Sequence, residues 1–256
     1  MSSVHYTISG AGPAVVLLHG GTGSSETYWA GQVLELARSF TLILMDHRGF
    51  GKSEDVGDFS IEACADDVIS VLDDRDLDRA DLVGLSLGGA IALQTALNAP
   101  LRVRRLVLAD TFSAVKTERF RRFIDYALIG ALRAGGVELM TNLNLIFAHG
   151  EDYLREHRND PRPSAEDWSP RQVERYISAL EQIRDWDIDD RLGEITAPAL
   201  VVWGSDDIEV PRSYAVRLAE ALPNALMTVI PEAGHKTCTD RPEAFNKLLR
   251  TFLSAN

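Results

Sequence analysis

The chain has 256 residues, and its 26 Lys and Arg against 38 Asp and Glu give a formal net charge of −12. With 45% hydrophobic and 25% charged residues, its composition is that of an ordinary soluble globular protein. The acidic balance argues against nucleic acid as a partner, because phosphate binding needs clustered Lys and Arg. Two cysteines, Cys64 and Cys238, are too few for a disulfide scaffold or a Cys-rich zinc module.

The apolar runs are far shorter than the roughly eighteen residues that a membrane helix needs, so no membrane partner is expected. The first residues, Met1–Tyr6, have neither the basic region nor the apolar stretch of a signal peptide. We therefore expect a cytoplasmic protein. The sequence does not distinguish a monomer from a homodimer.

Short apolar runs that are rich in β-branched residues recur along the chain and predict buried strands. In chain order they are Ala14–Leu18, Thr41–Met45, Leu82–Leu85, Leu106–Ala109, Ala199–Trp203 and Ala225–Ile230. Near-continuous apolar runs are typical of parallel strands that are covered on both faces.

Amphipathic patterns between these runs predict helices. The apolar residues of Ile61–Leu72 recur on one helical face, and Ser60 precedes them as a candidate N-cap. Similar patterns follow at Ala90–Leu97, Tyr214–Leu222 and Ala244–Phe252. Strands that alternate with helices indicate βαβ units and a doubly wound α/β sheet.

The alternation breaks over residues 112–191, where no strand pattern is present. Three apolar stripes predict helices there, with Ser169 as the N-cap of the last. They lie within Phe120–Leu128, Val137–Ile146 and Val173–Ile183. A long helical insertion between two strands indicates a cap or lid. We therefore predict a core of residues 1–111 and 192–256 and a cap of residues 112–191.

The strongest chemical signal is the segment Gly84–Gly88, GLSLG, which has the form Gly-x-Ser-x-Gly. It follows a predicted strand and opens a helical pattern, which is the context of a nucleophile elbow. The turn is so tight that larger side chains two residues before and after the serine would clash. We therefore predict that Ser86 is a nucleophile at a helix N-terminus. The alternative is a structural serine in a glycine-rich turn.

A second glycine-rich turn, His19–Gly23, follows the first buried strand. An oxyanion hole needs two backbone N–H donors aimed at the same point. Leu87, the residue after the predicted nucleophile, would supply one donor. Gly21 is the first choice for the other donor and Thr22 the second, and a merely flexible turn is the alternative.

The segment Asp46–Ser53, DHRGFGKS, ends in a Gly-Lys-Ser that imitates a phosphate-binding loop. The phosphate-binding motif also requires a glycine where this chain has Asp46, and a helix directly after Ser53. Neither requirement is met, so we reject nucleotide binding. We predict a structural turn held by hydrogen bonds of Asp46 and Arg48.

A base and an acid are the remaining requirements of serine chemistry. Asp207 lies in a loop that follows the predicted strand Ala199–Trp203, where ligands bind in such sheets. His235 comes after Gly234 and follows the last predicted strand. The order Ser86, Asp207, His235 is the one expected for this set of motifs. Three other histidines are interpreted as structural: His5, His149 and His157.

Together these motifs closely resemble those of the α/β-hydrolase superfamily, in the family's order. They are LLHGG at Leu17–Gly21, DHRGFGKS at Asp46–Ser53, GLSLGG at Gly84–Gly89, GSDDIEVP at Gly204–Pro211 and AGH at Ala233–His235. They are most similar to the branch of small esterases, enol-lactonases and carbon–carbon hydrolases. In that branch the acid usually occurs as Gly-x-x-Asp-x-x-x-Pro, which matches Asp207 and not Asp206.

The resemblance implies the α/β-hydrolase fold, a mostly parallel eight-stranded sheet with helices on both faces. It also implies a helical cap inserted after the sixth strand. The first strand of the family is not obvious before Tyr6–Ser9, so the N-terminal edge of the sheet is expected to be shortened.

The motifs and the resemblance predict a serine hydrolase that acts on a small carboxylic ester or lactone. Ser86 would attack the carbonyl, His235 would move the proton, and Asp207 would orient the imidazole. No metal and no organic cofactor are implied. The alternatives are a carbon–carbon hydrolase or cofactor-free lyase that uses the same site, and a ligand-binding receptor with residual hydrolysis. Relatives with an Asp nucleophile are excluded because residue 86 is serine.

Residues of the cap are expected to decide the substrate. Six aromatic residues are candidates for an apolar pocket, although roughly half of them should be core: Tyr28, Trp29, Phe112, Phe147, Trp168 and Trp186. Three arginines could hold a substrate carboxylate, but a solvated helix face is the favoured interpretation: Arg119, Arg121 and Arg122.

Overall fold

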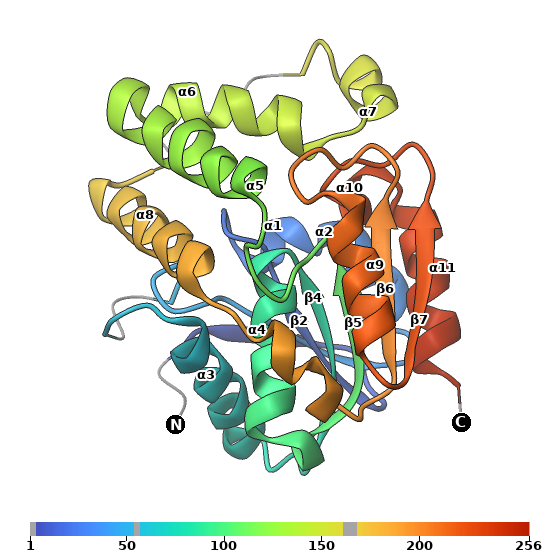
Figure 1. Ribbon diagram of the computed structural model, residues 1–256. Coiled ribbons are helices and arrows are strands. Elements are labelled where there is room, and N and C mark those ends of the chain that lie inside the picture. Colours follow the sequence, from blue (N-terminus) through green and yellow to red (C-terminus); the bar gives the residue numbers. More distant parts are fainter. Residues whose placement is uncertain (1–3, 54–56, 161–167, 256) are drawn as a thin grey trace.

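The computed structural model describes residues 4–53, 57–160 and 168–255 and is built on one central sheet (Figure 1). Its strands lie in the order β1-β3-β2-β4-β5-β6-β7, and all neighbours are parallel except β1 and β3. The strands are β1 Tyr6–Ser9, β2 Ala14–Leu18, β3 Thr41–Met45, β4 Ala80–Leu85, β5 Val103–Ala109, β6 Ala199–Gly204 and β7 Ala225–Ile230. All six strands predicted from apolar runs are therefore confirmed.

The described part of the chain forms seven strands, whereas the family resemblance implied eight. β1 is an edge strand, because it pairs with β3 alone and no described residue adds a strand beyond it. The N-terminal edge of the sheet is therefore shortened, as the sequence predicted. As a consequence, the long helical insertion follows the fifth strand, β5, and not the sixth.

Helices cover both faces of the sheet (Figure 1). One face carries α3 Ile61–Asp74, α4 Leu87–Asn98 and α9 Arg212–Ala221. The other face carries α2 Ala30–Leu36 and α11 Pro242–Leu253. Successive strand residues point to opposite faces of the sheet. Val16 therefore packs in the core on the side of α3, α4 and α9, and Leu17 in the core on the side of α2 and α11. Within the described ranges, no helix combines the length and the apolar character needed to cross a bilayer.

Capping residues set the starts of two predicted helices. Ser60 accepts a hydrogen bond from the N–H of Ala63 at 3.0 Å and begins α3. Ser169 begins α8 (Pro170–Asp185), and Gln172 completes its capping box. Four short helices were not predicted, because none is long enough to display a periodic apolar stripe. They are α1 Ser25–Tyr28, α2, α7 Glu151–Glu156 and α10 Thr237–Asp240.

The helices between β5 and β6 lie over the carboxyl ends of the strands (Figure 1). α5 (Glu118–Arg122) runs into a π-helix (Phe123–Ile129) and then into α6 (Gly130–Ala148). Gly136, with a φ of 68°, interrupts this run and separates the two helices predicted there. The boundaries of a cap at residues 112–191 stay a prediction, and residues 161–167 of that range lie outside the described residues.

Candidate active site

Ser86 stands in the turn between β4 and α4 with a left-handed backbone, at φ 54° and ψ −117°. Steric contact explains the glycines around it. A Cβ on Gly84 would lie 2.2 Å from the carbonyl oxygen of Gly88, and a Cβ on Gly88 would lie 2.1 Å from that of Leu18. The N–H of Ser86 donates to the carbonyl of Ala109 at 2.9 Å, which ties the turn to β5. The strained serine turn expected from the motif is therefore present.

Asp207 and His235 come together at the ends of β6 and β7. Nδ1 of His235 lies 3.0 Å from Oδ2 of Asp207, and both side chains are buried. The other carboxylate oxygen of Asp207 accepts hydrogen bonds from the N–H groups of Glu209 and the next residue, at 2.9 and 3.0 Å. Asp206, by contrast, accepts a hydrogen bond from the exposed hydroxyl of Ser205. The structure thus brings His235 to Asp207 and not to Asp206.

His235 is surrounded by carboxylates. Its Nε2 lies 3.6 Å from Oε2 of Glu209, and within the described chain no hydrogen bond joins its ring to the Ser86 hydroxyl. Burial by itself disfavours the imidazolium. The negative charges of Asp207, Glu209 and Asp110 outweigh burial and raise the pKa of His235 to about 10. Hydrogen bonds between catalytic groups often tighten only in the complex with substrate.

The two backbone groups expected to form an oxyanion hole line the same cavity. Leu87 opens α4, so its N–H has no acceptor within the helix. Neither it nor Gly21 donates a hydrogen bond to another described residue. Tyr176 lies against this turn, since a Cβ on Gly21 would come within 3.1 Å of its ring. The hydroxyl of Thr22 contacts that of Tyr28 at 2.9 Å. The choice of Gly21 over Thr22 stays a prediction.

Two buried histidines shape the turn that carries Gly21. The ring centroids of His19 and His47 are 4.0 Å apart. The N–H of His47 donates to Nε2 of His19 at 3.1 Å, so Nδ1 of His19 carries the proton and donates to the carbonyl of Gly20 at 2.6 Å. Burial lowers the pKa of His19 to about 4, which keeps this ring neutral.

The turn after β3 has the structural role that the sequence predicted. Asp46 accepts hydrogen bonds from the N–H and the hydroxyl of Ser25, each at 2.7 Å. Arg48 donates two hydrogen bonds to the buried carboxylate of Asp67, each at 2.8 Å. Lys52, the residue that imitates a phosphate-binding lysine, pairs with an exposed glutamate at 3.1 Å. These side chains therefore hold the loop in place.

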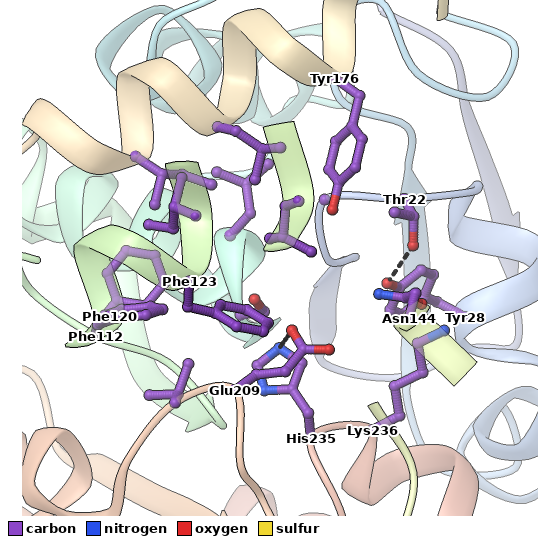
Figure 2. Close-up of a pocket in the computed structure, with 18 residues that line it drawn as sticks. Thr22, Tyr28, Phe112, Phe120, Phe123, Asn144, Tyr176, Glu209, His235 and Lys236 are labelled. Carbon is purple, nitrogen blue, oxygen red and sulfur yellow. Dashed lines mark hydrogen bonds and ion pairs between the residues drawn. The ribbon is translucent and has the colours of Figure 1, made fainter. Parts of the chain in front are cut away.

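A small cavity of about 50 Å³ lies between the strand ends and the helices over them (Figure 2). Ser86, His235 and Gly21 line it from the core. The side chains that reach it from residues 112–191 are mainly apolar, among them Phe112, Phe120, Phe123, Ile124 and Leu180. This cavity leaves room for a small group beside Ser86, and it shares Thr22, Tyr28 and Lys236 with a neighbouring space of about 580 Å³.

Three of the six aromatic candidates line a cavity, and one of these three, Phe112, is also part of the core. Tyr28 and Phe112 line this cavity, and Trp168 lines a neighbouring one together with Tyr28. The other three pack against aromatic neighbours: Trp29, Phe147 and Trp186. The three arginines of α5 are Arg119, Arg121 and Arg122, and none of them lines the cavity. Arg121 pairs with Asp185 and Arg122 with Glu118, and both of these acids are exposed.

Three buried acids near the site were not predicted. Asp110 directly follows β5 and accepts a hydrogen bond from the hydroxyl of Thr237 at 2.6 Å, and burial raises its pKa. Asp240 pairs with His149 at 2.6 Å, which agrees with the structural interpretation of that histidine. Glu209 lines the cavity, and its only signal in the sequence is its place two residues after Asp207. Across the described ranges, no three His, Cys, Asp or Glu side chains are grouped as a metal site.

Comparison with known proteins identifies the family of the chain. A family model described as alpha/beta hydrolase fold matches residues 13–242. The chain is 35% identical over 256 residues to "Putative carbamate hydrolase RutD" of Caulobacter sp. (strain K31), covering 95% of this chain and 93% of that protein. It is 29% identical over 267 residues to the 2-hydroxy-6-oxo-6-phenylhexa-2,4-dienoate hydrolase of Burkholderia cepacia, covering 98% of this chain and 91% of that protein.

The fold is also similar to that of a solved relative. The enol-lactonase of Burkholderia xenovorans LB400 is 26% identical and superposes with a TM-score of 0.85, covering 98% of this chain and 96% of that one. The family match spans most of the chain, and the relatives above are similar over nearly its full length. The protein is therefore a hydrolase, and the chain belongs to the alpha/beta hydrolase fold family.

Proposed function

We propose that this hydrolase cleaves a small carboxylic ester or lactone through an acyl-enzyme on Ser86. The observation that carries the proposal is the convergence of a nucleophile, a base with its acid, and two backbone donors on one small cavity. These groups are Ser86, His235 with Asp207, and the N–H groups of Leu87 and Gly21. These groups come from four different loops. Acyl transfer to serine needs the nucleophile, the base with its acid, and the two donors.

The proposed reaction has two halves. Oγ of Ser86 bonds to the carbonyl carbon while Nε2 of His235 takes its proton, and the oxyanion accepts hydrogen bonds from Leu87 and Gly21. The carbon–oxygen bond to the leaving group breaks, and His235 gives the proton to the leaving oxygen. Water then attacks the acyl-enzyme, and its proton passes through His235 to Ser86 as the acid leaves. Asp207 keeps the proton on Nδ1 and stabilises the imidazolium.

The substrate class rests on the shape and chemistry of the cavity. Its small volume and apolar lining favour a compact acyl group. Carbamates share with esters and lactones an acyl carbon bonded to oxygen, so the names of the relatives add carbamates to the substrates worth testing. We further propose that residues 112–191 act as a cap that shapes the pocket, since Phe120 and Ile124 are among its lining residues.

A second candidate is hydrolysis of a carbon–carbon bond by the same residues. The 29% identical relative named as a dienoate hydrolase favours it. The two candidates differ in the atom that receives the proton from His235, which is an oxygen in an ester and a carbon in a diketone. A substrate panel that contains both kinds of bond separates them.

Ser86→Ala tests the proposal, with p-nitrophenyl acetate, γ-butyrolactone, phenyl carbamate and a 2-hydroxy-6-oxodienoate as substrates. We expect the parent protein to hydrolyse an acyl–oxygen substrate and to gain one phosphonate adduct by mass spectrometry. Ser86→Ala should lose the adduct and at least about three orders of magnitude of activity. Ser70→Ala, at an exposed serine of α3, is the matched control. Retained turnover in Ser86→Ala, or cleavage of the dienoate alone, would contradict the ester assignment.

A further inference from the structure

Glu209 is a carboxylate of the cavity that the proposed mechanism does not use. Its side chain is 10% exposed, and its Oε2 lies 3.6 Å from Nε2 of His235. Its other oxygen, Oε1, is buried and has no hydrogen-bond partner among the described residues. Figure 2 shows this carboxylate directly above the His235 ring, at the edge of the cavity.

The backbone holds Glu209 in this position. Oδ1 of Asp207 accepts hydrogen bonds from the N–H groups of Glu209 and Val210, so the acid that orients His235 also anchors the neighbouring loop. Ile208, which lies between Asp207 and Glu209 in the sequence, is 61% exposed. The loop therefore turns one side chain to solvent and the next into the cavity, and the place of Glu209 follows from the same contacts that form the Asp207–His235 pair.

A buried carboxylate oxygen without a donor is costly, and such groups in proteins are nearly always hydrogen-bonded. Burial raises the pKa of Glu209, and the charge of Asp207 acts in the same direction, against His235 and Lys236. Lys236 does not reach it as a partner, because its ammonium lies over the Tyr28 ring, 5.3 Å from the centroid. Oε1 thus remains a buried acceptor without a donor among the described residues, on a side chain that lines the cavity.

We propose that Glu209 is a substrate-binding residue that accepts a hydrogen bond from an N–H or O–H group on the leaving group, with a protonated amine preferred. This inference rests on the proposed function. In that reaction Nε2 of His235 gives its proton to the leaving oxygen, so the leaving group must lie beside Nε2. Glu209 is 3.6 Å from the same nitrogen. A donor a few bonds beyond the leaving oxygen can therefore reach this carboxylate, and the substrates are esters of amino or hydroxy alcohols.

Other roles of Glu209 have different consequences. A carboxylate that only orders the hydrolytic water would affect all esters equally. A carboxylate that only tunes His235 would change the pH profile and leave substrate preference untouched. Four titratable groups surround Glu209 and contribute to any pH profile of the site: Asp207, His235, Lys236 and Tyr176. Burial and the charge of Glu209 both raise the pKa of the Tyr176 hydroxyl.

The test uses two acetates of the same shape. 2-(Dimethylamino)ethyl acetate carries a protonated amine at neutral pH, where 3-methylbutyl acetate has a C–H group. The ratio of their kcat/KM values is measured by pH-stat in the parent protein, Glu209→Gln and Glu209→Asp. Glu194→Gln removes an exposed, surface-paired carboxylate and is the control for the change in net charge.

We expect the parent protein to prefer the amine ester, and Glu209→Gln to lower the ratio by about tenfold or more, since a charge-assisted hydrogen bond is lost. Glu209→Asp should recover part of the preference, and Glu194→Gln should leave it unchanged. Equal loss on both acetates, or an unchanged ratio in Glu209→Gln, would overturn the inference while leaving the proposed function intact. If the parent protein cleaves neither acetate although phosphonate still labels Ser86, the inference fails. If Ser86 is not labelled either, the proposed function fails with it.

Discussion

Replacing Asp207 with asparagine perturbs one atom of the proposed site. Oδ1 of Asp207 accepts two backbone N–H bonds, at 2.9 and 3.0 Å, and an asparagine must keep its amide oxygen there. Its NH2 group then takes the place of Oδ2, 3.0 Å from Nδ1 of His235. A donor at that point stabilises the imidazole tautomer with its proton on Nε2. In that tautomer His235 cannot take the proton of Ser86.

The magnitude follows from the loss of the base. The corresponding substitution in a serine protease triad lowers kcat by about 10⁴-fold, or about 5 kcal/mol of transition-state stabilisation. The contacts around Asp207 predict a loss of the same order here. The fold should be retained, because asparagine has the volume of aspartate and keeps the backbone contacts. The loss should therefore appear in kcat and not in the circular dichroism spectrum.

The assay measures kcat for the hydrolysis of p-nitrophenyl acetate, in variants whose thermal stability matches that of the parent protein. Asp206→Asn is the matched control, because the Asp206 carboxylate accepts a hydrogen bond from the exposed Ser205 hydroxyl and does not contact His235, and we expect activity within about twofold of the parent. A loss below tenfold in Asp207→Asn would refute the tautomer argument. A larger loss in a folded Asp110→Asn variant would move the acid to the end of β5.

Three further predictions concern stability and pH. Gly88→Ala should lower the free energy of unfolding in urea by about 3 kcal/mol or more, because its Cβ would lie 2.1 Å from a carbonyl oxygen of β2. Gly193→Ala, whose Cβ meets nothing within 4 Å, should change it by less than about 0.5 kcal/mol, and equal effects would contradict the steric argument. Arg48→Met leaves the buried carboxylate of Asp67 uncompensated and should cost about 3 kcal/mol in the same measurement, whereas no loss would mean that the pair is solvated. With the pKa of His235 raised to about 10, kcat/KM for a neutral ester should rise with pH up to about that value, and a plateau near neutral pH would refute the assigned electrostatics. The protonated ring stabilises the fold, so this contribution is complete below the ordinary pKa of 6.5 and is lost as the pH rises towards 10.

Features that depend on neighbouring residues could be predicted from the sequence. The bounds of β2, β3 and β7 coincide with the predicted apolar runs, and β2 shows why, since a central strand buried on both faces must be apolar throughout. The turn at Ser86 is also local, because steric contact within and beside the motif demands glycine at positions 84 and 88. The short helices escaped prediction because one or two turns display no period.

Contacts between distant segments were decided by the tertiary structure. His235 lies 28 residues after Asp207, and the two meet because β6 and β7 are parallel neighbours with adjacent carboxyl ends. No local pattern separates Glu209, which turns into the cavity, from the exposed Ile208 beside it. The sequence by itself therefore determined where the strands, the longer helices and the serine turn occur, because periodicity and sterics act over a few residues. Only the tertiary structure decided which side chains meet at the strand ends, because that depends on the register and packing of segments far apart in the chain.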